Sequence, residues 1–164
     1  MDQNRFVPLA DMSASDIRNV TAPGLMLSIR ERQPHVLILD WDGAKYALKL
    51  DGPDAFGFFP VSAKTPHDGL YVPNVEILVD LDSRGIGRGR DEDKGVLILE
   101  EGQLFVLGKQ VGDGWSDPRP VPLWTKVAGG SEGARVAFDR WAIGLQEGDD
   151  YRILWSYEFK PKAD

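Results

Sequence analysis

Alternation of hydrophobic and polar residues near the end of the chain limits its fold more tightly than any other feature. From Tyr151 to Phe159, the residues Tyr, Ile, Trp, Tyr and Phe occupy every second position, with mostly polar residues between them. A period of two places successive side chains on opposite faces of a β-strand, whereas an amphipathic helix needs a period near 3.6. We therefore predict a strand with one mainly aromatic face. The segment Val75 to Leu81 alternates in the same way and predicts a half-buried strand.

Turn residues connect further strands into hairpins. Asp42-Gly43 and Glu101-Gly102 each separate two short apolar runs, and glycine favours the positive φ of tight hairpin turns. A third hairpin is expected around Gln33-Pro34, through either a tight turn or a longer loop. The other expected strands are Leu25 to Arg30, His35 to Trp41, Lys45 to Leu50, Phe56 to Val61, Val96 to Glu100, Leu104 to Leu107, Val121 to Val127 and Arg135 to Trp141.

Only the beginning of the chain carries a helical pattern. Ser13 and Asp16 resemble a helix-capping pair, and Ile17 and Val20 would share one face of a short helix. The longer helices that parallel βαβ units need are missing. The sequence thus predicts a mainly β protein, an antiparallel β-sandwich or barrel of about eight to ten strands with one short N-terminal helix. Without a repeat or an evident linker, residues 1–164 are expected to form a single domain.

Charge and cysteine content limit the classes of partner. The 19 basic and 26 acidic residues give a formal net charge of -7, which opposes the attraction to phosphates that drives most nucleic-acid binding. The chain has no cysteine, which excludes thiolate metal clusters and cysteine nucleophiles. No apolar run approaches about 18 residues, and the first residues lack a signal-peptide pattern. We expect a soluble, cytoplasmic protein that binds neither nucleic acid nor membrane and needs no cofactor; homo-oligomers are left open.

The segment Asp80 to Gly95 is unusually long and charged for a connection between two strands. Its opening resembles an EF-hand calcium loop, with Asp80, Asp82 and Asp91 at the first, third and twelfth positions. Arg84 occupies the fifth position, where an oxygen ligand belongs, and no flanking helices are expected. We therefore favour a solvated turn and keep the three aspartates as the alternative metal site.

Two loops carry candidate binding residues. Arg84, Arg88 and Arg90 could hold a carboxylate or phosphate of a small molecule or an acidic partner. In the turn-rich segment 112–118, the Trp115 indole could form a platform for a ligand or partner, with Asp117 beside it. The simpler interpretations are a mobile hairpin tip for the arginines and a cap on the core for the tryptophan.

Two segments share a family likeness. Val36 to Leu50, with its Trp-Asp-Gly turn, and Asn74 to Asp82 resemble strands of the haem- and sugar-binding DOMON-type sandwiches. The likeness covers about a fifth of the chain, and alternating strands of this composition arise in many unrelated β proteins. No binding residue or function is therefore carried over from it.

Concentrated catalytic motifs are absent from the sequence. His35 and His67 lack the spacing of a zinc site, and no Gly-x-Ser-x-Gly motif occurs. Our first hypothesis is a non-catalytic binding or interaction module whose β scaffold presents loops 80–95 and 112–118 to a small molecule or a partner protein. The alternatives are a carboxylate-based hydrolase or isomerase with its site in a sandwich cleft or barrel mouth, and a structural subunit of a larger assembly.

Overall fold

The computed structural model describes residues 12–30, 33–62, 68–86, 93–112, 118–123 and 135–160, and the structural findings concern these residues. The chain divides into two compact units. Unit 1 comprises Met1–Val75 with Gln110–Gly112, and unit 2 comprises Glu76–Lys109 with Asp113–Asp164. The single-domain organisation expected from the sequence stays a prediction.

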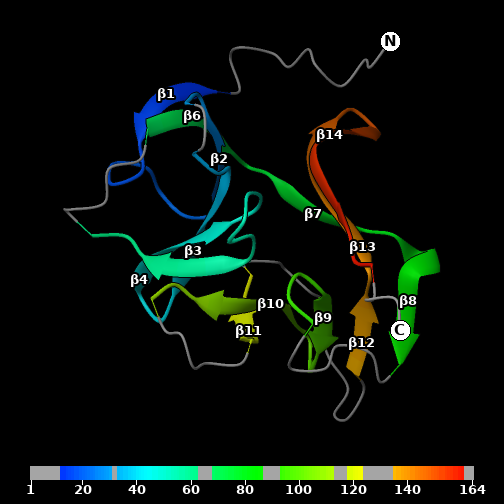
Figure 1. Ribbon diagram of the computed structural model, residues 1–164. Coiled ribbons are helices and arrows are strands. Elements are labelled where there is room, and N and C mark those ends of the chain that lie inside the picture. The colour runs from blue at the N-terminus through cyan, green and yellow to red at the C-terminus, as the bar shows by residue number, and fades with distance from the viewer. Residues whose placement is uncertain are drawn as a thin grey trace. The chain divides into compact units, whose positions relative to one another are not determined.

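The described residues confirm a mainly β protein. They hold fourteen strands, β1 to β14, and one turn of 3-10 helix, η3, at Leu81–Ser83 (Figure 1). Within these residues, no sheet closes into a barrel. In the same part of the chain, no helix is long and apolar enough to cross a membrane.

Unit 1 is built on one antiparallel sheet with the strand order β1-β6-β2-β3-β4-β5. All four residues Val36 to Leu39 of β3 are buried, as expected for a central strand covered on both faces. One face of the sheet packs with the turn after β1 into a core cluster. The strands of unit 1 are β1 (Ser13–Asp16), β2 (Gly24–Ser28), β3 (Val36–Trp41), β4 (Ala44–Lys49), β5 (Gly57–Pro60) and β6 (Asp68–Pro73). The cluster contains Ile17, Val20, Met26, Val36, Ile38, Ala47 and Tyr71.

Unit 2 contains two groups of antiparallel strands. In the first, β10, β9, β12 and β8 follow one another, and β11 also pairs with β10. In the second, a three-stranded sheet has β13 between β7 and β14 (Figure 1). The strands of unit 2 are β7 (Glu76–Val79), β8 (Arg84–Ile86), β9 (Leu97–Glu100), β10 (Gln103–Gln110), β11 (Arg119–Pro122), β12 (Arg135–Phe138), β13 (Arg140–Glu147) and β14 (Asp150–Glu158).

The two hairpin turns predicted from glycine are confirmed. Asp42 and Gly43 have φ of 52° and 78° and connect β3 to β4, with Trp41 opposite Ala44. The turn at Glu101-Gly102 has φ of 52° and 75° and connects β9 to β10. Positive φ at both central residues is the geometry of a two-residue turn that matches the twist of the paired strands. The antiparallel pairing of β2 with β3 also confirms the third expected hairpin, although residues 31–32 of its connection lie outside the described ranges.

The prediction of a short N-terminal helix is wrong. Residues Ser13–Asp16 form β1, which pairs with β6, and the chain then turns. The Asp16 carboxylate accepts the backbone N–H of Arg18 at 2.8 Å, so this side chain stabilises a turn instead of a helix start. Ile17 and Val20 are buried in the core of unit 1. A turn also brings residues three apart to one side, so the spacing did not distinguish the two structures.

The predicted strand Arg135 to Trp141 is two strands in different sheets. A bend at Asp139 separates β12, which pairs with β9, from β13, which pairs with β7 and β14. The strand number also exceeds the predicted eight to ten, because short strands such as β8 are too brief to show alternation.

Candidate functional site

A β-bulge decides which side chains share a face of the three-stranded sheet. Ile143 pairs with Trp155 and the next residue, Gly144, pairs with Ile153, so Leu154 is an extra residue on β14. Cross-strand partners lie on one face, and successive residues alternate between faces. Ile153 therefore lies on the face opposite Trp155, and the prediction of one continuous aromatic face is wrong before the bulge.

The register defines two faces, which we name by their character. The aromatic face carries Ile77, Val79, Trp141, Ile143, Trp155 and Tyr157. The polar face carries Leu78, Asp80, Arg140, Ala142, Ser156 and Glu158.

The aromatic face anchors the sheet within unit 2. Trp141 is 2% exposed, and its indole Nε1–H donates to the carbonyl oxygen of Gly95 at 2.8 Å. The ring centroid of Trp141 lies 4.8 Å from that of Trp155, edge to face, and Trp155 stacks on Tyr157 with an interplanar angle of 4°. The Tyr157 hydroxyl donates to the carbonyl oxygen of Lys94 at 3.2 Å. This face therefore fixes the sheet to the end of the Asp80 to Gly95 segment.

Burial also alters the acidity of the Tyr157 phenol. Its pKa is raised from 10.0, first by burial and then by the negative charges of Asp139 and Asp93. Both causes disfavour the phenolate. The hydroxyl thus stays protonated as a hydrogen-bond donor over the ordinary pH range.

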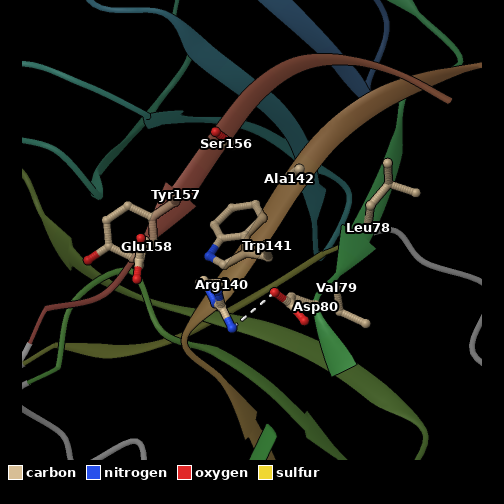
Figure 2. A pocket seen from close by; sticks show the side chains of 9 residues that line it. All are labelled: Leu78, Val79, Asp80, Arg140, Trp141, Ala142, Ser156, Tyr157 and Glu158. Carbon is tan, nitrogen blue, oxygen red and sulfur yellow. Dashed lines mark ion pairs between the residues drawn. The ribbon is translucent and has the colours of Figure 1, made fainter. Parts of the chain in front are cut away.

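The polar face is hollowed into an open groove of about 350 Å³ (Figure 2). Arg140 of β13 and Asp80, which follows β7, point toward each other across it, with Nη2 and Oδ2 3.2 Å apart. Glu158 is the cross-strand partner of Arg140 on the other side. The groove is lined by all six residues of the polar face and by three residues that alternate with them along the strands, Val79, Trp141 and Tyr157.

A buried hydroxyl holds this ion pair in place. Ser83 is 8% exposed, and its Oγ–H donates to the Asp80 carbonyl oxygen at 2.7 Å. Ser83 Oγ also accepts the backbone N–H of Arg140 at 3.1 Å, and the Asp80 N–H donates to the Arg140 carbonyl oxygen at 3.0 Å. Backbone and side-chain hydrogen bonds thus fix the relative positions of the two charged residues.

The groove combines two kinds of contact surface. Leu78 and Ala142 supply apolar surface, while Arg140 of the central strand pairs with the Asp80 carboxylate and has Glu158 as its cross-strand partner. The Ser156 hydroxyl adds a group that both donates and accepts hydrogen bonds. The arrangement can therefore pack a small apolar group and pair with polar groups on either side of it.

Of the candidate residues predicted from sequence, only Asp80 lines this groove among those described. Asp82 donates its backbone N–H to the Asp80 carboxylate at 2.9 Å, which caps the η3 turn. Arg84 folds back instead, and its Nη1 donates to the Leu81 carbonyl oxygen at 2.7 Å. The remaining candidates lie outside the described residues: Arg88, Arg90, Asp91, Trp115 and Asp117.

The structure gives no further support to the calcium hypothesis. Asp80 is engaged by the Asp82 N–H and by Arg140, and a bound cation would compete with both. Within the described ranges, no group of three His, Asp or Glu side chains could hold a metal. Because Asp91 lies outside those ranges, the site at Asp80, Asp82 and Asp91 stays a prediction.

Sequence reasoning missed four residues that build the site. Ser83 and Arg140 are 57 positions apart, so their contact has no local signal. Ser156 and Glu158 alternate with the aromatic residues of β14, and no role is predicted for them from the sequence. Their polar character was the one signal that could have indicated a second functional face.

The fold and the groove define a protein built from antiparallel sheets, with an open groove at a three-stranded sheet. Comparison with known families goes further: the chain belongs to the family described as "Uncharacterised protein y4lG", whose model matches residues 14–164. Protein y4lG of Sinorhizobium fredii (strain NBRC 101917 / NGR234) is 26% identical over 140 residues, which cover 85% of each chain. No solved structure matches this chain.

Proposed function

We propose that the protein is a non-catalytic interaction module, and that the groove on the polar face of unit 2 receives a segment of a partner protein. The observation that carries this proposal is the groove itself, in which a fixed Arg140–Asp80 ion pair adjoins apolar surface of Leu78 and Ala142. Sheets that position such groups rigidly are suited to recognition.

The open form of the groove favours a polypeptide over an enclosed substrate. Small-molecule sites bury most of the ligand surface, whereas this groove is open to solvent. Loop 80–95 begins at Asp80, so in our proposal its arginines extend the contact beyond the groove, as does loop 112–118. A sandwich scaffold and a cytoplasmic location belong to this proposal too.

The enzyme alternative receives less support from the groove. A carboxylate mechanism needs two acids that face one another across a bound substrate. Here Arg140 lies between Asp80 and Glu158, pairing with the first and lying opposite the second in register. Such an arrangement suits charge pairing with a ligand better than proton transfer to it.

Filling the groove tests the proposal. Ala142→Phe places a ring on the floor without changing any charge, and Ala44→Phe, at an exposed position of β4 in unit 1, is the matched control. The full chain, labelled with ¹⁵N, is titrated with a panel of short extended peptides of varied charge and hydrophobicity. We expect binding peptides to shift the amides of Leu78, Ala142 and Ser156 in wild type and Ala44→Phe, and the shifts to disappear in Ala142→Phe.

Two results would count against an interaction module of this kind. One is a peptide that binds Ala142→Phe as tightly as wild type, which would place recognition elsewhere. The other is turnover of a substrate that depends on Glu158 or Asp80, which would establish the carboxylate enzyme instead.

A further inference from the structure

A second hollow, in unit 1, has a different chemical character. Its volume is about 450 Å³, and it lies between the turn after β1 and the beginning of β4. The described residues that line it supply two cationic groups, an amide, a hydroxyl and one aliphatic side chain, and no carboxylate. They are Arg18, Asn19, Lys45, Val61 and Ser62. In a chain with a net charge of -7, a lining of this sign favours an anion.

Backbone carbonyl groups hold the Lys45 ammonium in position. Its Nζ donates to the carbonyl oxygen of Arg18 at 3.3 Å and to that of Val20. The Val61 N–H in turn donates to the Lys45 carbonyl oxygen at 2.9 Å, which holds these two lining residues side by side. An ammonium has three N–H donors, so one remains for a ligand after these two bonds.

Two of the acids near this hollow are paired with arginines. Asp16 accepts two side-chain hydrogen bonds from Arg18, at 2.8 and 2.7 Å, and these bonds hold the pKa of Asp16 far below its ordinary value. Asp68 pairs with Arg30 at 2.9 Å. These four charges cancel, which leaves Lys45 as the net charge among the described residues that line the hollow.

One further carboxylate lies opposite Lys45 in the sheet. Asp40 is its cross-strand partner between β3 and β4, and it is exposed at the surface. The Lys45 ammonium contacts the carbonyl groups of the turn, and Asp40 is not among the described residues that line the hollow. Asp40 can therefore compete with a bound anion without being part of its site.

We propose that this hollow binds a small molecule through a phosphate or carboxylate group. Lys45 supplies the positive charge, while the Asn19 amide and the Ser62 hydroxyl offer hydrogen bonds to the anion oxygens. Val61 gives the carbon skeleton of the ligand an apolar contact. This site is independent of the groove in unit 2, because the two share no residue.

Anion titrations of the full chain test the site. Inorganic phosphate and acetate are titrated separately into ¹⁵N-labelled protein at constant ionic strength, and we expect saturable shifts of the Asn19 and Ser62 amides with at least one of them. Saturation by phosphate alone assigns a phosphate ligand, and saturation by acetate alone assigns a carboxylate. Lys45→Met should weaken the binding by about tenfold or more, because it removes the charged donor.

Two further variants make the result independent of any loss of stability in Lys45→Met. Asn19→Asp places a carboxylate at an exposed lining position and should abolish binding, whereas Asp40→Asn removes the competing acid and should strengthen it. The proposal is overturned if neither anion gives saturable shifts at Asn19 and Ser62. It is equally overturned if wild type, Lys45→Met and Asn19→Asp bind the anion with the same affinity.

Discussion

Replacing the buried Trp141 by phenylalanine should destabilise unit 2 strongly, although both residues are aromatic. The indole is 2% exposed, and its N–H is the donor to the Gly95 carbonyl oxygen at 2.8 Å. Phenylalanine has no donor, so a buried acceptor loses its partner, which costs about 1–3 kcal/mol. The missing ring atoms leave a small cavity against Trp155, worth about another 1 kcal/mol. We therefore expect Trp141→Phe to lower the free energy of unfolding by about 2–4 kcal/mol.

The measurement is chemical denaturation followed by far-ultraviolet circular dichroism. Trp41→Phe is the control, because Trp41 is only half-buried and packs on Tyr46 and Phe58 at centroid distances of 5.4 and 5.7 Å. Its indole N–H has no hydrogen-bond partner among the described residues, so the change should cost about 1 kcal/mol or less. The denaturant dependence should match wild type in both variants. Equal losses for Trp141→Phe and Trp41→Phe would refute the reasoning, since the hydrogen bond to Gly95 would then contribute nothing measurable.

Three further predictions follow from single contacts. A Cβ on Gly144 would lie 2.8 Å from the Arg152 carbonyl oxygen, so Gly144→Ala should lower stability by about 1–3 kcal/mol, and an unchanged melting temperature would contradict the bulge geometry. Arg18 lowers the pKa of Asp16, so this carboxylate stabilises the fold above about pH 4 and loses that contribution as pH falls; Asp16→Asn should flatten the acid limb of the melting temperature, and an identical limb would disprove it. The pKa of Tyr157 is raised, as is that of Tyr151, so the stabilisation from the Tyr157 phenol is full below about pH 10 and is lost as pH rises above it; Tyr157→Phe should remove one tyrosine from the late part of the tyrosinate absorbance titration, and an unchanged late part would contradict the raised pKa.

Hairpins were the most predictable part of the fold because short-range conformation decides them. Asp42-Gly43 and Glu101-Gly102 adopt the positive φ of tight hairpin turns, and flanking apolar runs supply the paired strands. The N-terminal turn was mistaken for a helix for the same reason: Ile17 and Val20 satisfy a three-residue spacing in both structures. A local sequence pattern therefore predicted the structure only where a single local conformation accounts for that pattern.

The candidate site was mostly unpredictable because register and distant contacts create it. Leu154 is apolar like its neighbours, so nothing in the sequence marks it as the residue that shifts the pairing of β14. Asp80 was recognised through a resemblance to a calcium loop, yet its partner Arg140 lies far along the chain and reaches it through sheet pairing. Alternation within a strand shows which side chains point to opposite faces, but it does not show which other strand pairs with it.

The extra residue in β14 divides this strand into two parts whose side chains contact different neighbours. Before Leu154, the Tyr151 side chain interacts with Glu76, whose hydrogen bond and charge raise the pKa of this tyrosine. After Leu154, the Trp155 ring packs against the Trp141 ring. Deleting Leu154 would shift the register of the preceding residues of β14 by one position. Their side chains would then exchange faces, so those now exposed to solvent would point toward the interior, and the reverse. Substitutions ahead of Leu154 can thus alter the outside of the molecule while the tryptophan stack beyond it stays as it is.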